Sequence, residues 1–266
     1  MTDIMILGDT HGDTNEYLHA LERANETNIK HIFQVGDCGF FPSFSDVHDH
    51  LDTVQRVSAE SNVTNYWVRG NHDDPDAWQN TIDDYPARSG FGYLRKNILL
   101  APRVGYFKRF GLNFLAVGGA VSIDREWRIM EEFRRKQPKT LWWPNESVSD
   151  DDMELVNGKH VDVLLTHDCS DHTQFHTRLK PDIDSKINRQ KIDSVLLRAT
   201  PDIHFHGHMH TEYEWDNHIS SHGQHSTKTY GLECNQNAMH DYYAAPNNWI
   251  IFNTETRTAT WRKDDN

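Results

Sequence analysis

The sequence predicts an α/β protein built on a largely parallel β-sheet. Short apolar segments end repeatedly in residue types that bind metal ions, beginning with Ile4–Leu7, which leads into Gly8, Asp9, Thr10 and His11. Helical segments separate the first three of these strands, and a β-α-β-α-β order with right-handed crossovers makes strands parallel. Ligands of open α/β sheets bind at the carboxyl ends of the strands. We therefore expect five strand ends to converge on one site.

The first third of the chain contains two predicted crossover helices. Apolar residues recur at helical spacing in residues 13–24, and Asp13 with Glu16 fits a capping box. A second apolar stripe, with the same spacing, runs from Phe44 to Ser58. The strands that follow these helices, around residues 31–35 and 66–68, end at Asp37 and Asn71.

The pattern changes after Pro75. Residues 98–101, 104–109 and 112–117 are predicted strands, and the last two form a hairpin about Phe110 and Gly111. The remaining predicted elements are helices at 124–136, 150–156 and 184–198, strands ending at His167 and His208, and a hairpin of 249–252 and 256–261. We expect one domain over residues 1–266, with a helical, Trp-rich insert near 123–157 and an irregular excursion near 211–245.

Composition limits the possible partners. The 266 residues include 40 acidic and 27 basic side chains, for a net charge of −13. Binding to long duplexes is not expected, because it requires clustered Lys and Arg. Cys38, Cys169 and Cys234 are too few and too widely spaced for a disulfide framework, so we expect reduced thiols. Without a signal region or an apolar run of ~20 residues, a soluble cytoplasmic protein with no membrane contact is expected.

The polar residues at the strand ends form a mixed set of oxygen and nitrogen ligands. Such a set suits Mn, Fe, Zn or Ni. Seven ligands are too many for one ion and fit two divalent ions that share a bridging carboxylate, which can clamp a phosphoryl group and generate hydroxide near neutral pH. His72, beside the ligand Asn71, is free to protonate a leaving oxygen as a general acid. The expected ligands are Asp9, His11, Asp37, Asn71, His167, His208 and His210.

These motifs resemble those of the calcineurin-like metallophosphoesterase superfamily. Its pattern of Asp-x-His, Gly-Asp, Gly-Asn-His-Asp/Glu, a lone His and Gly-His-x-His is matched in order. The resemblance implies a four-layer sandwich of two mixed β-sheets flanked by helices, and hydrolysis of a phosphodiester or phosphomonoester with two divalent ions, Mn being expected. It also implies the ligand sets: Asp9, His11, Asp37 and His210 for one ion, and Asp37, Asn71, His167 and His208 for the other, with Asp37 bridging.

One departure separates the chain from the Ser/Thr protein phosphatases of this superfamily. Those enzymes carry Asp-Arg-Gly after the second motif, whereas here Asp37 is followed by Cys38, Gly39 and Phe40. The Gly-His-Met-His ending at His208 and His210 resembles the broader phosphoesterase branch. A small phosphorylated substrate is therefore expected rather than a phosphoprotein.

Two features have alternative interpretations. Asp73, a second catalytic candidate, either tunes His72 or caps the following turn. The segment 124–143 is either a solvated helix pinned by tryptophans, which we favour, or a phosphate clamp in which Arg125 and Arg128 contact substrate and a base stacks on Trp. The basic and aromatic residues of this segment are Arg125, Arg128, Arg134, Arg135, Lys136, Lys139, Trp127, Trp142 and Trp143.

The second interpretation gives an alternative function. A nuclease or nucleotide phosphodiesterase would use this segment to bind a nucleotide or short single-stranded nucleic acid. A non-catalytic scaffold is a third option, disfavoured because all expected ligands are present. Other histidines near the last motif are expected to support the ligands or to be solvated: His204, His206, His218, His222 and His225.

Overall fold

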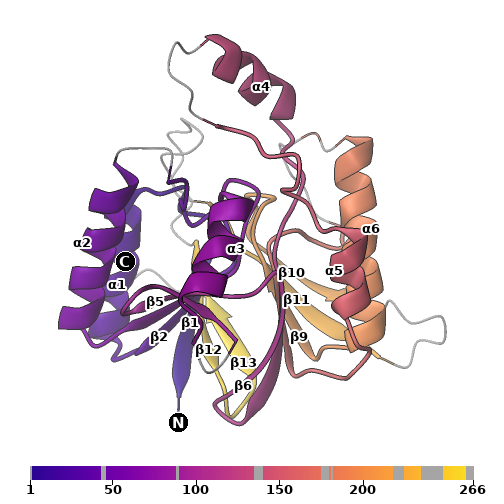
Figure 1. Cartoon of the computed structure of the whole chain (residues 1–266). Helices are drawn as coiled ribbons and strands as arrows, with labels where there is room; N and C mark the ends of the chain where they lie inside the picture. Colours follow the sequence, from indigo (N-terminus) through magenta and orange to yellow (C-terminus); the bar gives the residue numbers. More distant parts are fainter. Residues whose placement is uncertain are drawn as a thin grey trace.

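The computed structural model describes residues 2–42, 46–87, 90–134, 140–174, 180, 182–217, 225–234 and 248–261. Two β-sheets pack face to face, and helices cover their outer faces (Figure 1). A buried cluster that includes Phe33, Phe114 and Phe205 fills the space between the sheets. Two further clusters join each sheet to its helices. The four-layer sandwich predicted from the sequence is confirmed.

The first sheet has seven strands in the order β13-β12-β1-β2-β3-β5-β4. Its central strands β1, β2, β3 and β5 are parallel. Both faces of these strands are covered, and β1, with the sequence Asp-Ile-Met-Ile-Leu, is accordingly a nearly continuous apolar run. The strands are β1 (Asp3–Leu7), β2 (His31–Gln34), β3 (Thr64–Trp67), β4 (Gly92–Arg95), β5 (Ile98–Leu100), β12 (Trp249–Asn253) and β13 (Thr258–Trp261).

Helices α1 (Thr14–Glu26), α2 (Val47–Glu60) and α3 (Pro75–Asp84) pack on the outer face of the first sheet. The Asp13 side chain caps α1 by accepting hydrogen bonds from the backbone N–H groups of residues 15 and 16. The sequence did not predict α3, although Asp74 as N-cap followed by Pro75 is a typical helix start. The expected start of the second helix at Phe44 lies outside the described residues.

The second sheet has six strands in the order β10-β11-β9-β8-β7-β6. Strands β7, β8, β9 and β11 are parallel, and helices α5 (Asp150–Leu155) and α6 (Ile183–Ala199) cover its outer face. The strands are β6 (Val104–Arg109), β7 (Leu112–Val117), β8 (Val163–Thr166), β9 (Ile203–His206), β10 (Tyr213–Asn217) and β11 (Thr227–Gly231).

The expectation of irregular chain over residues 211–245 is wrong where β10 and β11 form. In β10 the exposed and half-buried residues alternate, as in an edge strand with one face in solvent. Its sequence Tyr-Glu-Trp-Asp-Asn is polar at every second position, which concealed the strand. Residues 218–224 and 235–247 lie outside the described residues.

Helix α4 (Arg125–Arg134) lies at the top of the view, apart from the layers (Figure 1). None of its residues is buried. Among the described residues, no helix is long and apolar enough to cross a membrane. The cysteines Cys38, Cys169 and Cys234 are free and buried, as expected for reduced thiols.

Candidate metal centre

All seven expected ligands come from loops at one edge of the two sheets. The backbone places them directly after five parallel strands, three in the first sheet and two in the second. The ligand loops are Asp9 and His11 after β1, Asp37 after β2, Asn71 after β3, His167 after β8, and His208 with His210 after β9.

One group of side chains consists of Asp9, His11 and His210. His210 Nε2 lies 3.1 Å from Asp9 Oδ2 and 3.3 Å from His11 Nε2. Burial opposes a positive charge on His210, but hydrogen bonding to Asp9 and Cys234 together with the charge of Asp9 raises its pKa to about 11. Asp9 therefore favours a positive charge at His210.

A second group consists of Asp9, Asp37 and His167. His167 Nδ1 lies 2.8 Å from the carbonyl of Val35, to which it can donate, so Nε2 faces the other ligands. There it lies 2.9 Å from Asn71 Oδ1 and 3.3 Å from Asp37 Oδ1. Burial lowers the pKa of His167, but the charges of Asp37 and Asp9 prevail and raise it to about 9.

Asp37 belongs to the second group and also to a third, with His11 and His72. Its Oδ1 faces His167, whereas its Oδ2 lies 3.7 Å from His11 Nδ1 and 3.7 Å from His72 Nε2. Burial raises the pKa of this carboxyl, but His72 and His167 outweigh burial and hold it well below the ordinary value. Each carboxylate oxygen therefore faces a different group of histidines, as a bridging ligand requires.

Several buried ligand atoms lack a hydrogen-bond partner among the described residues. They include Asp37 Oδ2 and His208 Nε2. Leaving such atoms unpaired in a protein interior costs free energy of roughly 1–3 kcal/mol each. Divalent cations bound at the two groups would satisfy these atoms, so the residues present fit metal binding.

The backbone at the centre is strained. Four of the ligands have φ values of +47° to +64°, a region that residues other than glycine rarely adopt. Each residue with such a φ value lowers the stability of the fold by on the order of 1–3 kcal/mol. Backbone strain of this kind is typical of functional sites. The four are His11, Asp37, His208 and His210.

Glycines before the ligands let loops approach closely. A Cβ on Gly70 would lie 2.1 Å from Asp37 Oδ1, and one on Gly207 would lie 2.0 Å from Asp9 Oδ1. No side chain fits at these distances. The glycines of the Gly-Asn-His and Gly-His motifs are therefore required by the packing of ligands from neighbouring strands.

His72 lies at the open side of the centre. Its ring is 4.8 Å from that of His11, between centroids. Arg128 from α4 places Nη2 within 2.8 Å of Nδ1 and 2.9 Å of Nε2 of His72. Burial first, and then the charge of Arg128, lower the pKa of His72 well below its ordinary value. Arg128 is held by Asp124 at 2.7 Å and by the carbonyl of Leu141 at 3.0 Å.

Arg125 does not share this position. It forms ion pairs of 2.8 Å with Asp184 and 3.1 Å with Asp182 at the start of α6. The two arginines expected to contact substrate therefore differ, and only Arg128 reaches the centre. Of the three tryptophans, Trp127 is 54% exposed and Trp143 is buried, whereas Trp142 is half-buried. Arg135, Lys136 and Lys139 lie outside the described residues.

Asp73, the second catalytic candidate, binds backbone N–H groups beside the centre. Its carboxylate accepts backbone hydrogen bonds from Gly70, Cys38, Gly39 and Phe40, at 2.8 to 3.2 Å. The following helix is capped by Asp74, not by Asp73. Burial and the nearby Asp37 raise the pKa of Asp73 to about 6. Asp73 thus joins the loop that carries Asp37 to the loop that carries Asn71.

The additional histidines lie behind or away from the ligands. His204 lies 2.7 Å from Thr166 Oγ1, and His206 contacts the Tyr213 hydroxyl. His225 lies 2.8 Å from the carbonyl of Pro201, and His218 and His222 lie outside the described residues. His204 and His206 are thus buried next to the loops that carry His167 and His208, whereas His225 lies at the other end of β9.

Ser122 and Glu146 belong to the site but were not predicted. Asn71 Nδ2 donates to Ser122 Oγ at 2.9 Å, and Ser122 donates from both its N–H and its hydroxyl to Glu146, at 2.6 Å each. This chain turns the Asn71 carbonyl oxygen toward His167. Burial raises the pKa of Glu146 to about 7. Because the contact joins loops 24 residues apart, no local pattern revealed it.

A family model for calcineurin-like phosphoesterases matches residues 2–212. With the fold and the site, this match defines a metallophosphoesterase, a class of phosphoric ester hydrolase. The chain belongs to the calcineurin-like phosphoesterase family, which confirms the resemblance inferred from its motifs.

Solved structures support the fold. The protein TT1561 of Thermus thermophilus is 10% identical, with 98% of each chain covered and a TM-score of 0.51. A dimetal phosphatase from Danio rerio is 13% identical, with 88% of this chain and 87% of that chain covered and a TM-score of 0.53. No curated protein matches the chain significantly.

Proposed function

We propose that this phosphoesterase uses two divalent metal ions, held by the seven ligands, to hydrolyse a small phosphorylated substrate. The observation that carries the proposal is the position of Asp37, whose two carboxylate oxygens face different histidine groups. Asp9, His11, Asp37 and His210 would hold one ion, and Asp37, Asn71, His167 and His208 the other. Mn is our first choice of metal, and Fe, Zn or Ni would also suit this donor set.

When bound, the two ions would stabilise the charge of the phosphoryl oxygens and activate a water molecule. The protein holds their ligands in strained loops on two rigid sheets, so little reorganisation is needed when substrate binds. The positive φ values of four ligands and the glycines beneath them support this interpretation.

His72 is the proposed general acid. It lies beside the ligands on the side of Asp37 Oδ2 and belongs to neither of the two proposed ligand sets. Arg128 contacts both of its ring nitrogens, so His72 would donate a proton to the leaving oxygen once a phosphoryl oxygen of the substrate pairs with Arg128 in its place. Asp73 contributes indirectly, by fixing the loop that carries Asn71 and His72.

Arg128 is the proposed phosphate contact of α4. Its Nη2 atom lies next to the His72 ring, so it would be able to pair with a phosphoryl oxygen bound beside His72. Trp127, on the same helix and largely exposed, is available for stacking with a base. This pair keeps a nucleotide phosphodiesterase or nuclease as the second candidate function.

The test combines metal content with turnover. The protein, loaded with Mn and freed of excess metal, should retain about two ions per chain by mass spectrometry. It should hydrolyse p-nitrophenyl phosphate or its bis ester, and comparison of the two assigns monoesterase or diesterase activity. Cyclic nucleotides and single-stranded DNA test the second candidate. Far fewer than two ions together with no turnover of any substrate would refute the proposal.

A further inference from the structure

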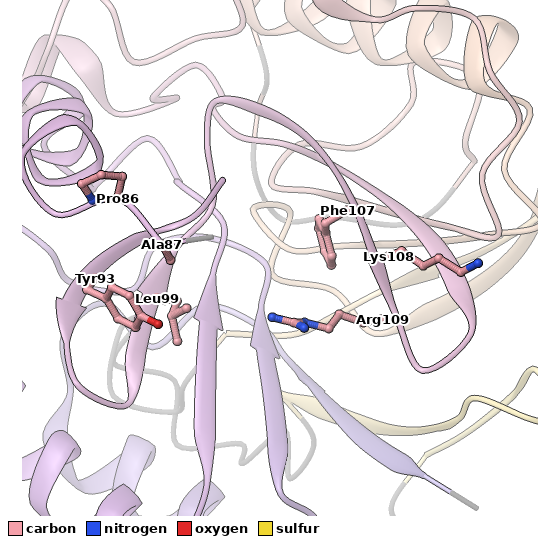
Figure 2. Close-up of a pocket in the computed structure, with 7 residues that line it drawn as sticks. All are labelled: Pro86, Ala87, Tyr93, Leu99, Phe107, Lys108 and Arg109. Atoms are coloured by element: carbon pink, nitrogen blue, oxygen red, sulfur yellow. The ribbon is translucent and has the colours of Figure 1, made fainter. Parts of the chain in front are cut away.

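A cavity of about 640 Å³ lies between the edges of the two sheets. Figure 2 shows the residues that line it. This volume is within the range of small-molecule sites. One wall belongs to the first sheet and the chain before it, and the other wall belongs to β6 of the second sheet. The lining residues are Pro86, Ala87, Tyr93, Leu99, Phe107, Lys108 and Arg109.

The cavity is separate from the metal centre. Arg109 pairs with Leu112, which is the first residue of β7. Strand β7 runs parallel to β8, whose opposite end leads into His167. Lys108 and Arg109 therefore lie at the end of the second sheet that is remote from the ligand loops.

The charges in the cavity have one sign. Its lining contains Lys108 and Arg109 but no acidic residue, in a chain whose net charge is −13. Within the described parts of the chain, neither cation forms an ion pair. The Arg109 guanidinium hydrogen-bonds to Tyr66, and its carbon lies 5.8 Å over the ring of that residue. The contact with Tyr66 leaves the charge of Arg109 uncompensated, so an anion in the cavity would find a cation with which to pair.

The uncharged part of the lining is largely apolar and includes two aromatic rings. Phe107 and Leu99 pack in the core between the sheets, where Phe107 lies 5.0 Å from Phe114 in a stacked arrangement. Tyr93, on the edge strand β4, is 46% exposed. In Figure 2, the Arg109 guanidinium points into the gap between Leu99 and Phe107, whereas the Lys108 amine points outward. A planar apolar body fits against these rings.

We propose that this cavity is a second binding site, for a small organic anion with a planar aromatic body. Arg109 would pair with the anionic group, Lys108 would add positive potential at the rim, and Tyr93 and Phe107 would contact the aromatic body. The site does not depend on the metal centre or on the reaction proposed there.

Naphthalene-2-sulfonate is a suitable probe, because a sulfonate is a weak metal ligand. Isothermal titration calorimetry should give a dissociation constant below about 1 mM, and the neutral naphthalene-2-sulfonamide should bind at least ~10-fold more weakly. Arg109→Gln should weaken sulfonate binding at least ~10-fold. Tyr93→Ser, a variant on an exposed edge strand, should also weaken it.

Two controls make the result specific. Arg56→Gln makes the same charge change on exposed α2 and should leave the affinity unchanged. Arg109→Gln should retain the hydrolytic activity of the unmodified protein, which verifies its fold. Equal affinity for the sulfonamide, unchanged affinity in both Arg109→Gln and Tyr93→Ser, or no binding at about 5 mM would each overturn the proposal.

Discussion

At the scale of single residues, Asp37 is the most informative position. It supplies one oxygen to each group of histidines, so its replacement tests both metal sites together. Asp37→Asn replaces a carboxylate, whose two anionic oxygens would be shared between the two ions, with an amide that offers one neutral oxygen. We expect loss of both ions at limiting metal and a decrease in activity of at least ~10²-fold. The measurement is metal content per chain after loading with increasing Mn.

Asn71→Ala is the matched comparison for that experiment. Asn71 contacts only the His167 side of the centre, and its removal takes away one neutral ligand. About one ion should remain, with a similar decrease in activity, because the reaction needs both ions. If Asp37→Asn still binds two ions tightly, Asp37 is not the bridge and the ligand sets must be reassigned.

His72→Ala tests the general acid. The variant should keep its metals and lose more activity on esters with poor leaving groups than on p-nitrophenyl esters. The reason is that a leaving group of low pKa needs little protonation. Arg128→Gln is the useful comparison, because the loss of a phosphate contact should affect both kinds of ester alike. Equal losses for His72→Ala on both esters would argue against the acid role.

The chain from Asn71 through Ser122 to Glu146 predicts a third effect. Glu146→Gln offers one acceptor oxygen where Ser122 donates two hydrogen bonds, so the orientation of the Asn71 amide becomes less well fixed. We expect weaker binding of the second ion and a loss of activity of roughly 10-fold, in line with other residues that orient metal ligands. Excess Mn should restore most of the activity of Glu146→Gln. No recovery at high Mn would show that Glu146 does not act through the metal site.

At the scale of elements, α2 contains a buried histidine that should make stability depend on pH. His50 is 5% exposed, and its Nδ1 lies 3.0 Å from Thr14 Oγ1 of α1. Burial lowers its pKa from 6.5 to about 4. Because the pKa of His50 is lower in the folded state than in the unfolded state, the free energy of unfolding keeps its full value above pH 6.5. It decreases as the pH falls toward 4. The loss amounts to about 3 kcal/mol.

Urea unfolding at several pH values measures this dependence. The free energy of unfolding of His50→Gln should fall less between pH 6.5 and 4 than that of the unmodified protein. His48→Gln, at an exposed position on the same helix, should keep the original slope. Identical slopes for His50→Gln and the unmodified protein would exclude His50 as the source.

The elements also indicate what a sequence can predict. Strands that deliver ligands were identified because short, mainly apolar segments, such as those of β1 and β8, end abruptly in polar residues. The edge strand β10 was missed by this criterion, because it has polar residues at alternate positions. The seven ligands share one edge of the sheets as expected, but Ser122 and Glu146 depend on contact between distant loops. Asp73 has a backbone-binding role that no local pattern distinguishes from a catalytic one.

At the scale of the whole molecule, the candidate metal centre joins the two sheets. Asp9, His11, Asp37 and Asn71 follow strands of the first sheet, whereas His167, His208 and His210 follow strands of the second. Bound ions would therefore link the two sheets and would provide partners for the unpaired ligand atoms. A ligand that binds only the folded state stabilises it by about 2.7 kcal/mol at a concentration of 100 times its dissociation constant.

This linkage predicts that Mn raises the melting temperature of the protein. With about 2–4 °C per kcal/mol for a chain of this size and about 2.7 kcal/mol from each of the two sites, saturation of both sites should raise the melting temperature by roughly 10–20 °C over the chelated protein. Asp37→Asn should lose most of this shift, because it removes a ligand from both ions. Asp3→Asn, which removes an exposed carboxylate at the start of β1, should keep the full shift. A shift of equal size in Asp37→Asn and in Asp3→Asn would mean that Mn stabilises the fold from some other site.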